Sequence, residues 1–331
     1  MKRALVIGSG SIAKRHIRNL RCLYPSAEVV CVSASGRQLK VSDVGATSIA
    51  NSVQEAILDK PDAAIVASPA NFHLLHAAPL IAAEIPVLIE KPICVELVEL
   101  SKFSFDETKN KVAVGYNLRF MPAAKVVKQI IDSKKLGRIS TVFAEVGQYL
   151  PDWRPEGDYR IGVSAQKKLG GGALLELSHE LDYLNWLFGS FDEVSAKIGC
   201  SNLLEIDVED TVDALITHQD GITFHVHLDF LQRSPSRSLK VISENGTLFW
   251  NLLTNEVVLY GPDAVSEMIY SDSDYNRNDM YIEQLRAFLA FASGDGEFDS
   301  TISTSIEVMW LVEAVRLSNQ QRAWVNLETV R

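Results

Sequence analysis

The sequence predicts an α/β protein with a doubly wound parallel sheet in its first part and a mainly antiparallel sheet in its second. Between residues 4 and 115, short apolar runs alternate with helical patterns, which is typical of parallel strands joined by right-handed helical crossovers. Between residues 193 and 260, strand patterns follow one another without helical patterns between them, and Glu244-Asn245-Gly246-Thr247 indicates a hairpin turn. The change of pattern predicts two domains.

The composition is that of an ordinary globular protein, since the 331 residues are 47% hydrophobic and 22% charged. A net charge of -10 excludes the basic surface that a general nucleic-acid binder needs. The four cysteines are scattered without metal-ligand spacing, and the apolar run before Gly8 is too short for a signal peptide or a membrane span. We therefore expect a cytoplasmic protein without a nucleic-acid partner, a membrane partner or a metal.

The first strand, expected at residues 4–7, leads into a glycine-rich turn. Residues 8–13 read Gly-Ser-Gly-Ser-Ile-Ala and open a helical pattern, which is the GxGxxG/A arrangement in its strand, turn and helix context. Gly8 permits the tight turn, and Gly10 lets the backbone approach a pyrophosphate held by helix-terminal amides. The expected dinucleotide contacts here are Gly8, Ser9, Gly10, Ser11 and Ile12. A turn without a ligand is the alternative.

The end of the second strand indicates which dinucleotide binds. An acid there would bind the ribose 2′-hydroxyl of NAD, whereas an arginine with small polar residues would bind the 2′-phosphate of NADP. This chain has Ser33, Ser35 and Arg37, and no acid before Asp43. The sequence therefore favours NADP, with NAD as the second choice, and assigns these three residues as contacts. The alternative is that Arg37 is a solvated loop residue and NAD binds without an acid.

The other elements of the first part continue the alternation. Strands are expected at 28–33, 47–49, 63–67, 87–89 and 112–115, and helices at 53–58, 72–83 and 94–104. Two strands end in polar residues at the carboxyl edge of the sheet, where ligands of open α/β sheets collect. The cofactor contacts expected at this edge are Ser68, Pro69, His73, Glu90 and Lys91.

Lys91 is the candidate proton-handling residue. At the mouth of a half-buried crevice the charged form of a lysine is disfavoured, which moves its pKa towards the range useful for proton transfer. The alternative is a solvated lysine paired with Glu90 or Asp62.

The second part combines a first helix, expected at 122–134, with a run of strands and two closing helices. The strands are expected at 140–149, 193–198, 212–218, 222–230, 239–243, 247–250 and 256–260, and the closing helices at 280–292 and 302–319.

Residues 151–160 form a loop dense in aromatic and ionic side chains. Arginines recognise carboxylate or phosphate groups, and aromatic rings stack on sugar or base faces. We interpret the loop as a substrate lid, with substrate contacts from Trp153, Arg154, Tyr159 and Arg160. The alternative is a surface loop held by arginine–aspartate pairs.

A helix is expected to follow Gly170-Gly171-Gly172. Glu176, His179 and Asp182 are spaced at i and i+3, so they would share one face of it. The helix is apolar nearly all round, which predicts burial, and a buried stripe of acid, histidine and acid is typical of an active site. We therefore expect substrate contacts from Glu176 and Asp182 and a catalytic role for His179. A strand at 222–230 carries His225 and His227, which we interpret as the polar outer face of a sheet rather than a metal site.

Several ordered motifs resemble the glucose-fructose oxidoreductase, inositol dehydrogenase and related (Gfo/Idh/MocA) family. They are Gly8-x-Gly10-x-Ile12-Ala13-x-x-His16, Ser68-Pro69-x-x-x-His73, Glu90-Lys91-Pro92, Gly115-Tyr116-Asn117-Leu118-Arg119-Phe120, Gly170-Gly171-Gly172, His179-x-x-Asp182 and Met280-Tyr281-x-x-x-Leu285-x-x-Phe288. The resemblance implies a Rossmann domain at 1–118 and, at 119–331, a substrate-binding and oligomerisation domain with an open, mainly antiparallel sheet. It also implies that Lys91 is the catalytic lysine, and Pro92 is expected to follow a cis peptide bond. The family places an aspartate four residues before the histidine, whereas Glu176 stands three before it.

The resemblance implies hydride transfer between nicotinamide and a hydroxyl-bearing carbon of a sugar, nucleotide sugar, sugar acid or cyclitol. Our hypothesis is that Lys91 and His179 exchange the hydroxyl proton while Asn117 and Arg119 support the nicotinamide or the substrate. The lid arginines favour an anionic sugar. A homodimer or homotetramer is expected through the open sheet face. Two alternatives are a dinucleotide-binding regulatory protein without turnover and an enzyme that uses tightly bound NAD(H) for transient oxidation.

Overall fold

The structure is a computed structural model that describes residues 1–103, 105–106, 109–263 and 265–331. Its described residues divide into two compact units. The first contains residues 1–117 and 277–306, and the second contains residues 118–276 and 307–331. The sequence predicted one domain boundary, between residues 118 and 119. The units differ from this prediction because residues 277–306 belong to the first unit.

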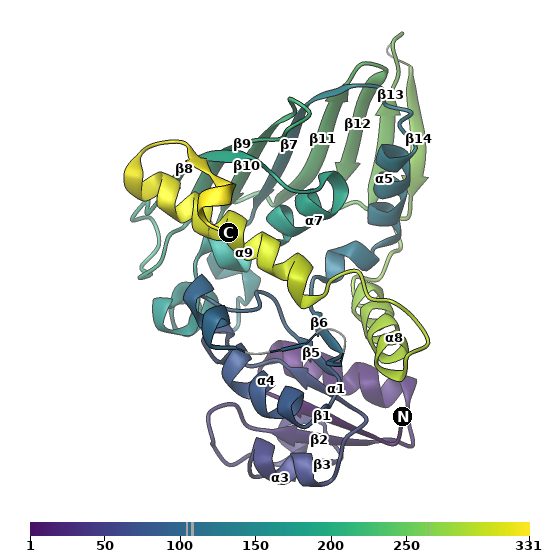
Figure 1. The fold of residues 1–331 in the computed structure, drawn as a ribbon, viewed down its shortest axis with the longest axis vertical. Helices are drawn as coiled ribbons and strands as arrows, with labels where there is room; N and C mark the ends of the chain where they lie inside the picture. The colour runs from purple at the N-terminus through teal and green to yellow at the C-terminus, as the bar shows by residue number, and fades with distance from the viewer. Residues whose placement is uncertain (104, 107–108, 264) are drawn as a thin grey trace. The chain divides into compact units, whose positions relative to one another are not determined.

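The first unit is built on six parallel strands in the order β3-β2-β1-β4-β5-β6 (Figure 1). Their bounds are β1 Arg3–Ile7, β2 Glu28–Val32, β3 Ser48–Ala50, β4 Ala63–Val66, β5 Val87–Ile89 and β6 Val112–Val114. The strands are short apolar runs and almost wholly buried, as expected for a parallel sheet covered on both faces. The doubly wound parallel sheet predicted from the sequence is confirmed.

Helices of the first unit join these strands or pack beside them. They are α1 Ser11–Leu23, α2 Val41–Val44, α3 Val53–Leu58, η1 Ala70–Phe72, α4 His73–Ala82, η2 Leu97–Lys102 and α8 Asp279–Ser293. The helix expected at 94–104 is the shorter 3₁₀ helix η2, and Ser104 lies outside the described residues. The carboxylate of Glu99 accepts hydrogen bonds from the amides of Val95 and Glu96, which caps the helix and sets its late start.

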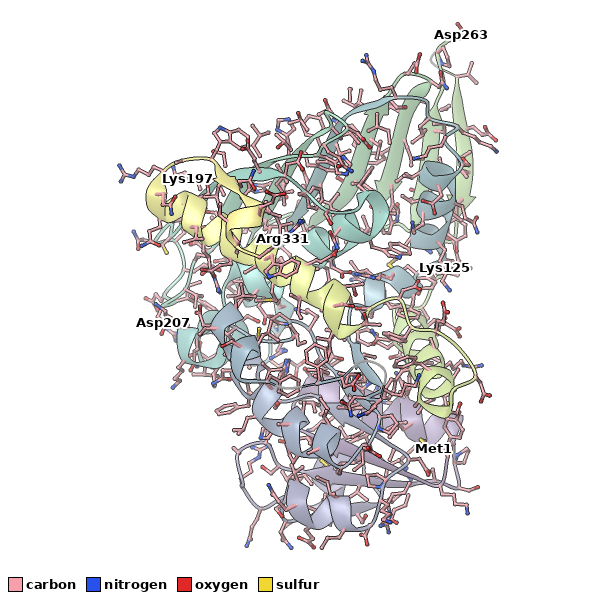
Figure 2. The ribbon with its side chains drawn as sticks, in the orientation of Figure 1. Met1, Lys125, Lys197, Asp207, Asp263 and Arg331 are labelled. Carbon is pink, nitrogen blue, oxygen red and sulfur yellow. The ribbon has the colours of Figure 1, made fainter. Side chains whose placement is uncertain are left out.

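The second unit is built on a nine-stranded sheet in the order β14-β13-β12-β11-β7-β10-β9-β8-β15. Its strands are β7 Ile139–Gly147, β8 Glu193–Gly199, β9 Thr211–Thr217, β10 Thr223–Asp229, β11 Ser236–Ser243, β12 Gly246–Asn251, β13 Glu256–Tyr260, β14 Ser266–Ser271 and β15 Val325–Asn326. In Figure 2, Lys197 on β8 lies towards one edge and Asp263, between β13 and β14, towards the other. All strand pairs are antiparallel except β7 with β10, so the mainly antiparallel prediction is confirmed.

Along β7 the side chains alternate, since Val142, Ala144 and Val146 are buried while Phe143 is exposed. One face of the sheet therefore carries helices and the other is open. The helical elements are α5 Pro122–Asp132, α6 Ala173–Glu176, α7 His179–Phe188, η3 Asn117–Phe120, η4 Leu150–Trp153, η5 Tyr159–Ile161, η6 Val163–Ala165, η7 Lys167–Leu169 and η8 Leu327–Thr329, with α9 Ile302–Gln321 shared between the units.

The other predicted elements agree with the structure to within a few residues, but several elements were not predicted, among them the four-residue helix α2 and the short 3₁₀ helices of the second unit. β14 and β15 were missed, because one is an exposed strand and the other has only two residues. The helix expected after Gly172 is broken, since Leu177 and Ser178 separate α6 from α7. There Ser178 and Glu180 donate backbone hydrogen bonds three residues back rather than four, which rotates the following helix relative to the preceding one.

Candidate active site

The carboxyl ends of β1, β4 and β5 bring three predicted motifs together. Ile7 pairs with Val66, and Val66 pairs with Ile89, so the three strands end in register. The segments that follow them are the glycine turn at 8–13, Ser68-Pro69 and Glu90-Lys91-Pro92. Parts of the sequence far apart along the chain thus meet at one edge of the sheet, where ligands of such folds bind.

The glycine turn has the geometry that a pyrophosphate needs. Gly8 has φ +124°, and a Cβ there would lie 2.3 Å from the carbonyl oxygen of Ala67. A Cβ on Gly10 would point into open space. Gly10 also caps α1 without a side-chain hydrogen bond, and the first turn of α1 holds no acid. The amides and positive end of α1 are therefore open to an anion, so these residues fit a dinucleotide.

Arg37 lies beside this turn. Its guanidinium donates a hydrogen bond to the hydroxyl of Ser9 at 2.9 Å, and the hydroxyls of Ser33 and Ser35 are 3.4 Å apart. Across the described residues Arg37 has no carboxylate within ion-pair distance. An exposed cation therefore stands with small polar groups at the end of β2.

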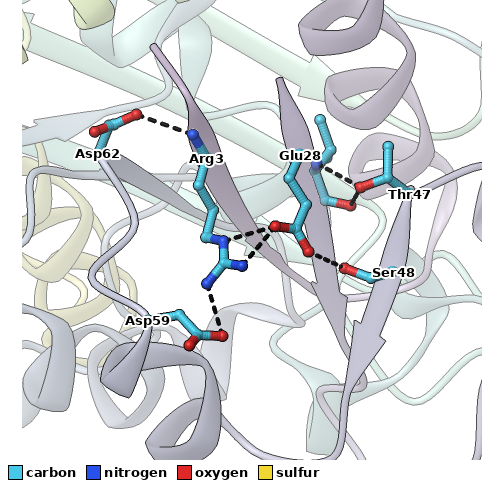
Figure 3. A network of polar contacts seen from close by, with 7 residues as sticks. Arg3, Glu28, Thr47, Ser48, Asp59 and Asp62 are labelled. Atoms are coloured by element: carbon cyan, nitrogen blue, oxygen red, sulfur yellow. Dashed lines mark hydrogen bonds and ion pairs between the residues drawn. The ribbon is translucent and has the colours of Figure 1, made fainter. Parts of the chain in front are cut away.

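Lys91 is partly buried directly after β5, and the Lys91–Pro92 peptide bond is cis, as expected. The acids considered as its partners are engaged elsewhere. Glu90 contacts the ring of His16 at 2.6 Å. Asp62 accepts hydrogen bonds from the backbone amides of Lys2 and Arg3, at the amino ends of β1 and β4, and Figure 3 shows the one from Arg3. Because Lys91 follows a carboxyl end, Asp62 belongs to the opposite edge of the sheet.

His73 is 1% exposed and contacts backbone on both sides of its ring. Its Nδ1 lies 2.7 Å from the carbonyl oxygen of Pro92, and its Nε2 lies 2.8 Å from that of Ser68. Burial lowers the pKa of His73, and the two carbonyl groups oppose that change. The ring was predicted to contact the cofactor, but it has almost no surface to offer to one.

Two further residues predicted as cofactor contacts lie inside the first unit. Asn117 is buried and hydrogen-bonds to the hydroxyl of Tyr281. Glu90 is also buried, and its charge lies near the same tyrosine. Burial, followed by the charge of Glu90, raises the pKa of Tyr281. Asn117 and Glu90 therefore belong to an internal polar cluster behind the turn that carries Lys91.

In the second unit, Arg119 and Asp182 bind each other. The guanidinium donates from Nε at 3.0 Å and from Nη2 at 2.6 Å to the two carboxylate oxygens, and both side chains are buried. Burial raises the pKa of Asp182, and the charge of Arg119 opposes this rise. Both residues were predicted to bind substrate, but Asp182 is fully inaccessible in this arrangement.

The break between α6 and α7 separates Glu176 from His179. Glu176 ends α6 and accepts a hydrogen bond from the hydroxyl of Ser164 at 2.9 Å, while His179 begins α7. The predicted common helix face is therefore absent. Glu180 pairs with Arg237 at 2.8 Å, so both acids of α7 are held by arginines, and His179 is the partly exposed polar residue of its first turn.

The lid segment, residues 151–160, is held by internal contacts. Arg160 pairs with Asp158 at 2.8 Å and also with Glu205, and its hydrogen bonds lower the pKa of Asp158. Trp153 packs edge-on against Phe230 and donates its indole hydrogen to the carbonyl oxygen of Gln148. Tyr159 is partly exposed and Arg154 is exposed. For Arg160, the contacts therefore agree with the alternative given above, a surface loop held by arginine–aspartate pairs.

His225 and His227 lie on the open face of the second sheet with different partners. His225 stacks on Phe143, and His227 lies between Asp213 at 2.7 Å and Asp229 at 3.0 Å. These hydrogen bonds raise the pKa of His227 to about 9, and the bond to Asp229 has the larger effect. Among the described residues, no group of three or more histidines, cysteines and acids is arranged to hold a metal ion. The helices described include none that is long and apolar enough to cross a membrane.

Several residues that shape the site were not predicted. His16 pairs with Glu90, and Glu205 pairs with Arg160, although the partners are far apart in the sequence. The motif that contains His16 pointed to a role for that residue, whereas no motif pointed to Glu205. Together, the parallel sheet, the glycine turn and the open end of α1 define a dinucleotide-binding protein of the Rossmann class.

The chain belongs to the Gfo/Idh/MocA oxidoreductase family. Residues 2–117 match the model described as oxidoreductase family, NAD-binding Rossmann fold. Residues 124–249 match the model of the GFO/IDH/MocA C-terminal domain. The resemblance seen in the sequence is thereby confirmed.

Individual relatives are distant. The chain is 28% identical over 221 residues to a glucose-6-phosphate 3-dehydrogenase of Bacillus subtilis, which covers 64% of this chain and 62% of that protein, less than two thirds of its length. A solved levoglucosan dehydrogenase, in complex with NADH and levoglucosan, is similar with a TM-score of 0.84 and 19% identity over 98% of both chains. The solved structure of the WlbA dehydrogenase from Bordetella pertussis, in complex with NADH and UDP-GlcNAcA, is similar with a TM-score of 0.78 and 20% identity over 98% of both chains. At these identities the solved structures establish the fold.

Proposed function

We propose that this protein is an NAD(P)-dependent oxidoreductase that transfers a hydride between nicotinamide and a hydroxyl-bearing carbon of a sugar, nucleotide sugar, sugar acid or cyclitol. The observation that carries the proposal is the position of Lys91 at the same sheet edge as the open glycine turn. A proton-handling group and an anion-binding helix end are the two parts that alcohol oxidation at a dinucleotide needs. The names of the relatives support the substrate class.

Lys91 is the residue to which we assign the hydroxyl proton. When bound, the dinucleotide supplies a hydride acceptor at its nicotinamide. As the substrate carbon loses its hydride, the hydroxyl proton passes to the amine nitrogen of Lys91, and we propose His179 as the second residue that handles this proton. In the reverse direction Lys91 returns the proton. The open glycine turn holds the pyrophosphate during either step.

NADP is our preferred cofactor over NAD. Arg37 is exposed, is joined to Ser9 of the glycine turn, and stands beside Ser33 and Ser35, which is the set of groups that suits a 2′-phosphate. No acid precedes Asp43 in this segment, and Asp43 itself accepts a hydrogen bond from the amide of Lys40.

An anionic sugar is the substrate class that we favour within the proposal. Arg154 is exposed on the lid segment, and Trp153 and Tyr159 lie on the same segment. We also propose a cytoplasmic homodimer or homotetramer formed through the open face of the second sheet, where Phe143, Tyr260 and Met268 are exposed. Analytical ultracentrifugation of the full chain tests the assembly, and a monomer would contradict it.

The central experiment measures turnover and cofactor binding separately. The purified protein is assayed for NADP⁺ reduction with glucose 6-phosphate, levoglucosan, myo-inositol and UDP-GlcNAcA, and NADPH binding is followed by fluorescence. Lys91→Ala should lower turnover by about 10²- to 10⁴-fold while NADPH still binds, because general acid–base catalysis contributes that much. Lys60→Ala, at an exposed position of the same unit, should behave as the wild type. Undiminished turnover of Lys91→Ala would exclude the role of Lys91.

A further inference from the structure

Two buried histidines flank the turn that carries Lys91. We propose that His16 and His73 are positioning residues that hold Glu90 and Pro92, and thereby fix the direction of Lys91, without contacting cofactor or substrate. The inference rests on the role proposed for Lys91. It replaces the prediction that His73 binds the cofactor, and it gives His16 a function that the sequence did not reveal.

His16 holds the residue before Lys91. It lies on α1 and is 0% exposed, and its Nε2 is 2.6 Å from a carboxylate oxygen of Glu90. Its Nδ1 is buried, and no hydrogen-bond partner for this atom exists among the described residues. A carboxylate oxygen accepts hydrogen bonds, so Nε2 carries a proton and donates it to Glu90. The helix whose end binds the pyrophosphate is thereby joined to the turn after β5.

His73 holds the residue after Lys91. It begins α4, and its Nδ1 lies 2.7 Å from the carbonyl oxygen of Pro92. On the other side of the ring, Nε2 lies 2.8 Å from the carbonyl oxygen of Ser68. Both carbonyl oxygens only accept, so a ring with one proton donates to one of them, and we assign that proton to Nδ1 and Pro92. The ring thus lies between the segments that follow β4 and β5, which both lie at the proposed cofactor edge.

The turn is confined on a third side by Gly115, which follows β6. A Cβ at this position would lie 3.0 Å from a carboxylate oxygen of Glu90 and 3.2 Å from its Cα atom. Glu90 therefore fits between α1 and the end of β6 with little space to move. Since Glu90, Lys91 and Pro92 are consecutive, fixing the first and the third also fixes the backbone from which the Lys91 side chain extends.

The burial of the two histidines gives the proposal its distinctive consequence. Side chains that are 0% and 1% exposed cannot contribute direct contacts to a bound dinucleotide. Their replacement should therefore lower kcat and leave the dissociation constant of NADPH unchanged. A misplacement of a catalytic group by about 1 Å can lower the rate about 100-fold, which sets the expected size of the effect.

A crossed pair of substitutions separates this role from a general packing role. The amide nitrogen of asparagine can take the place of Nδ1, and that of glutamine can take the place of Nε2. His73 acts on Pro92 through Nδ1, so His73→Asn should keep most of the turnover while His73→Gln loses about 10- to 100-fold. His16 acts on Glu90 through Nε2, so the order should reverse, with His16→Gln the active variant and His16→Asn the impaired one. His225→Asn, a histidine of the second unit, should match the wild type.

The reactivity of Lys91 provides a readout that needs no substrate. Trace labelling with acetic anhydride, followed by mass spectrometry, compares the acetylation of Lys91 with that of the exposed Lys60 in the same sample. His73→Gln and His16→Asn should change this ratio several-fold, whereas His73→Asn, His16→Gln and His225→Asn should leave it unchanged. NADPH binding by each variant establishes that the first unit is folded.

The outcomes distinguish this inference from the proposed function. If the wild type turns over none of the four substrates, the proposed function fails, and if Lys91→Ala retains full turnover, the role of Lys91 and the positioning role that rests on it both fail. If Lys91→Ala is inactive but all four histidine variants keep wild-type turnover and labelling, the positioning role is wrong and the proposed function stands. Loss of NADPH binding in all four variants would also overturn the positioning role, because it would make the histidines part of the cofactor site or of the fold.

Discussion

The end of β2 and the second unit both contain arginines that the sequence predicted to contact cofactor or substrate, but their surroundings differ. Arg37, after β2, is exposed and contacts the hydroxyl of Ser9. Arg119 is buried against Asp182, and Arg160 is bound by Asp158 and Glu205. Arg119 and Arg160 are thus already neutralised by carboxylates, whereas Arg37 retains a cation next to an open helix end.

The difference teaches that the availability of an arginine depends on the acids that the fold places beside it. Asp158 is two residues from Arg160 and could be suspected from the sequence, but Glu205 is 45 residues away and Asp182 is 63 residues from Arg119. Substitutions of Arg119, Arg37, His227 and Arg160 test whether neighbouring acids set this availability.

The largest effect should come from the buried pair. Arg119→Met should reduce the free energy of unfolding by about 3–5 kcal/mol, because it leaves Asp182 buried without its charge partner. Urea denaturation of the wild type and the variant measures this. The double variant Arg119→Met/Asp182→Leu should recover much of the loss, since both charges are then removed. Equal stability of the wild type and the single variant would contradict a structural role of the pair and would favour the predicted substrate contact of Arg119.

Arg37 should give the next largest effect, and it should appear in binding rather than in stability. Arg37→Ala should weaken NADPH binding by about 10- to 100-fold, because one charge-assisted contact to the 2′-phosphate is lost. NADH binding should not change. Fluorescence titration with both dinucleotides measures the difference, and Arg160→Ala is the matched control. Equal weakening of NADPH and NADH would contradict a 2′-phosphate contact.

His227 extends the comparison to a cation between two acids. Its pKa of about 9 in the folded protein exceeds the ordinary value of 6.5, so its stabilising effect is full below pH 6.5 and is lost as the pH rises through 9. The wild type should therefore lose stability relative to His227→Gln between pH 6 and pH 10. Because the side chain is 40% exposed, solvent screening should keep this effect modest. Thermal melting across the pH series measures it, and a constant difference between the two proteins would contradict the raised pKa.

The smallest effect should come from Arg160. Arg160→Ala should leave the melting temperature unchanged, since the pair with Asp158 is exposed to solvent. The KM for UDP-GlcNAcA, as a probe for anionic sugars, should also be unchanged because the guanidinium is already neutralised. The matched variant Arg154→Ala should raise this KM if the lid segment binds an anion. A large rise in this KM for Arg160→Ala would show that Arg160, like Arg37, is available to bind an anion.

Much of the fold could be predicted, because strands, helices and glycine turns are set by neighbouring residues. The six parallel strands, the hairpin at 244–247 and the turn at 8–13 all appear in their expected places. The break at Leu177 could not be predicted, because the sequence there continues a helical pattern and only backbone hydrogen bonds reveal the change.

The sequence by itself determined the chemistry that is available: a glycine turn without an acid after it, an arginine at the end of β2, and a lysine directly after a buried strand. Only the tertiary structure decided which charged groups remain available. It joined His16 to Glu90 across 74 residues and Arg119 to Asp182 across 63. The physical reason is that a buried polar group needs a partner, and that partner is chosen by proximity in space, which the spacing of residues along the chain does not encode.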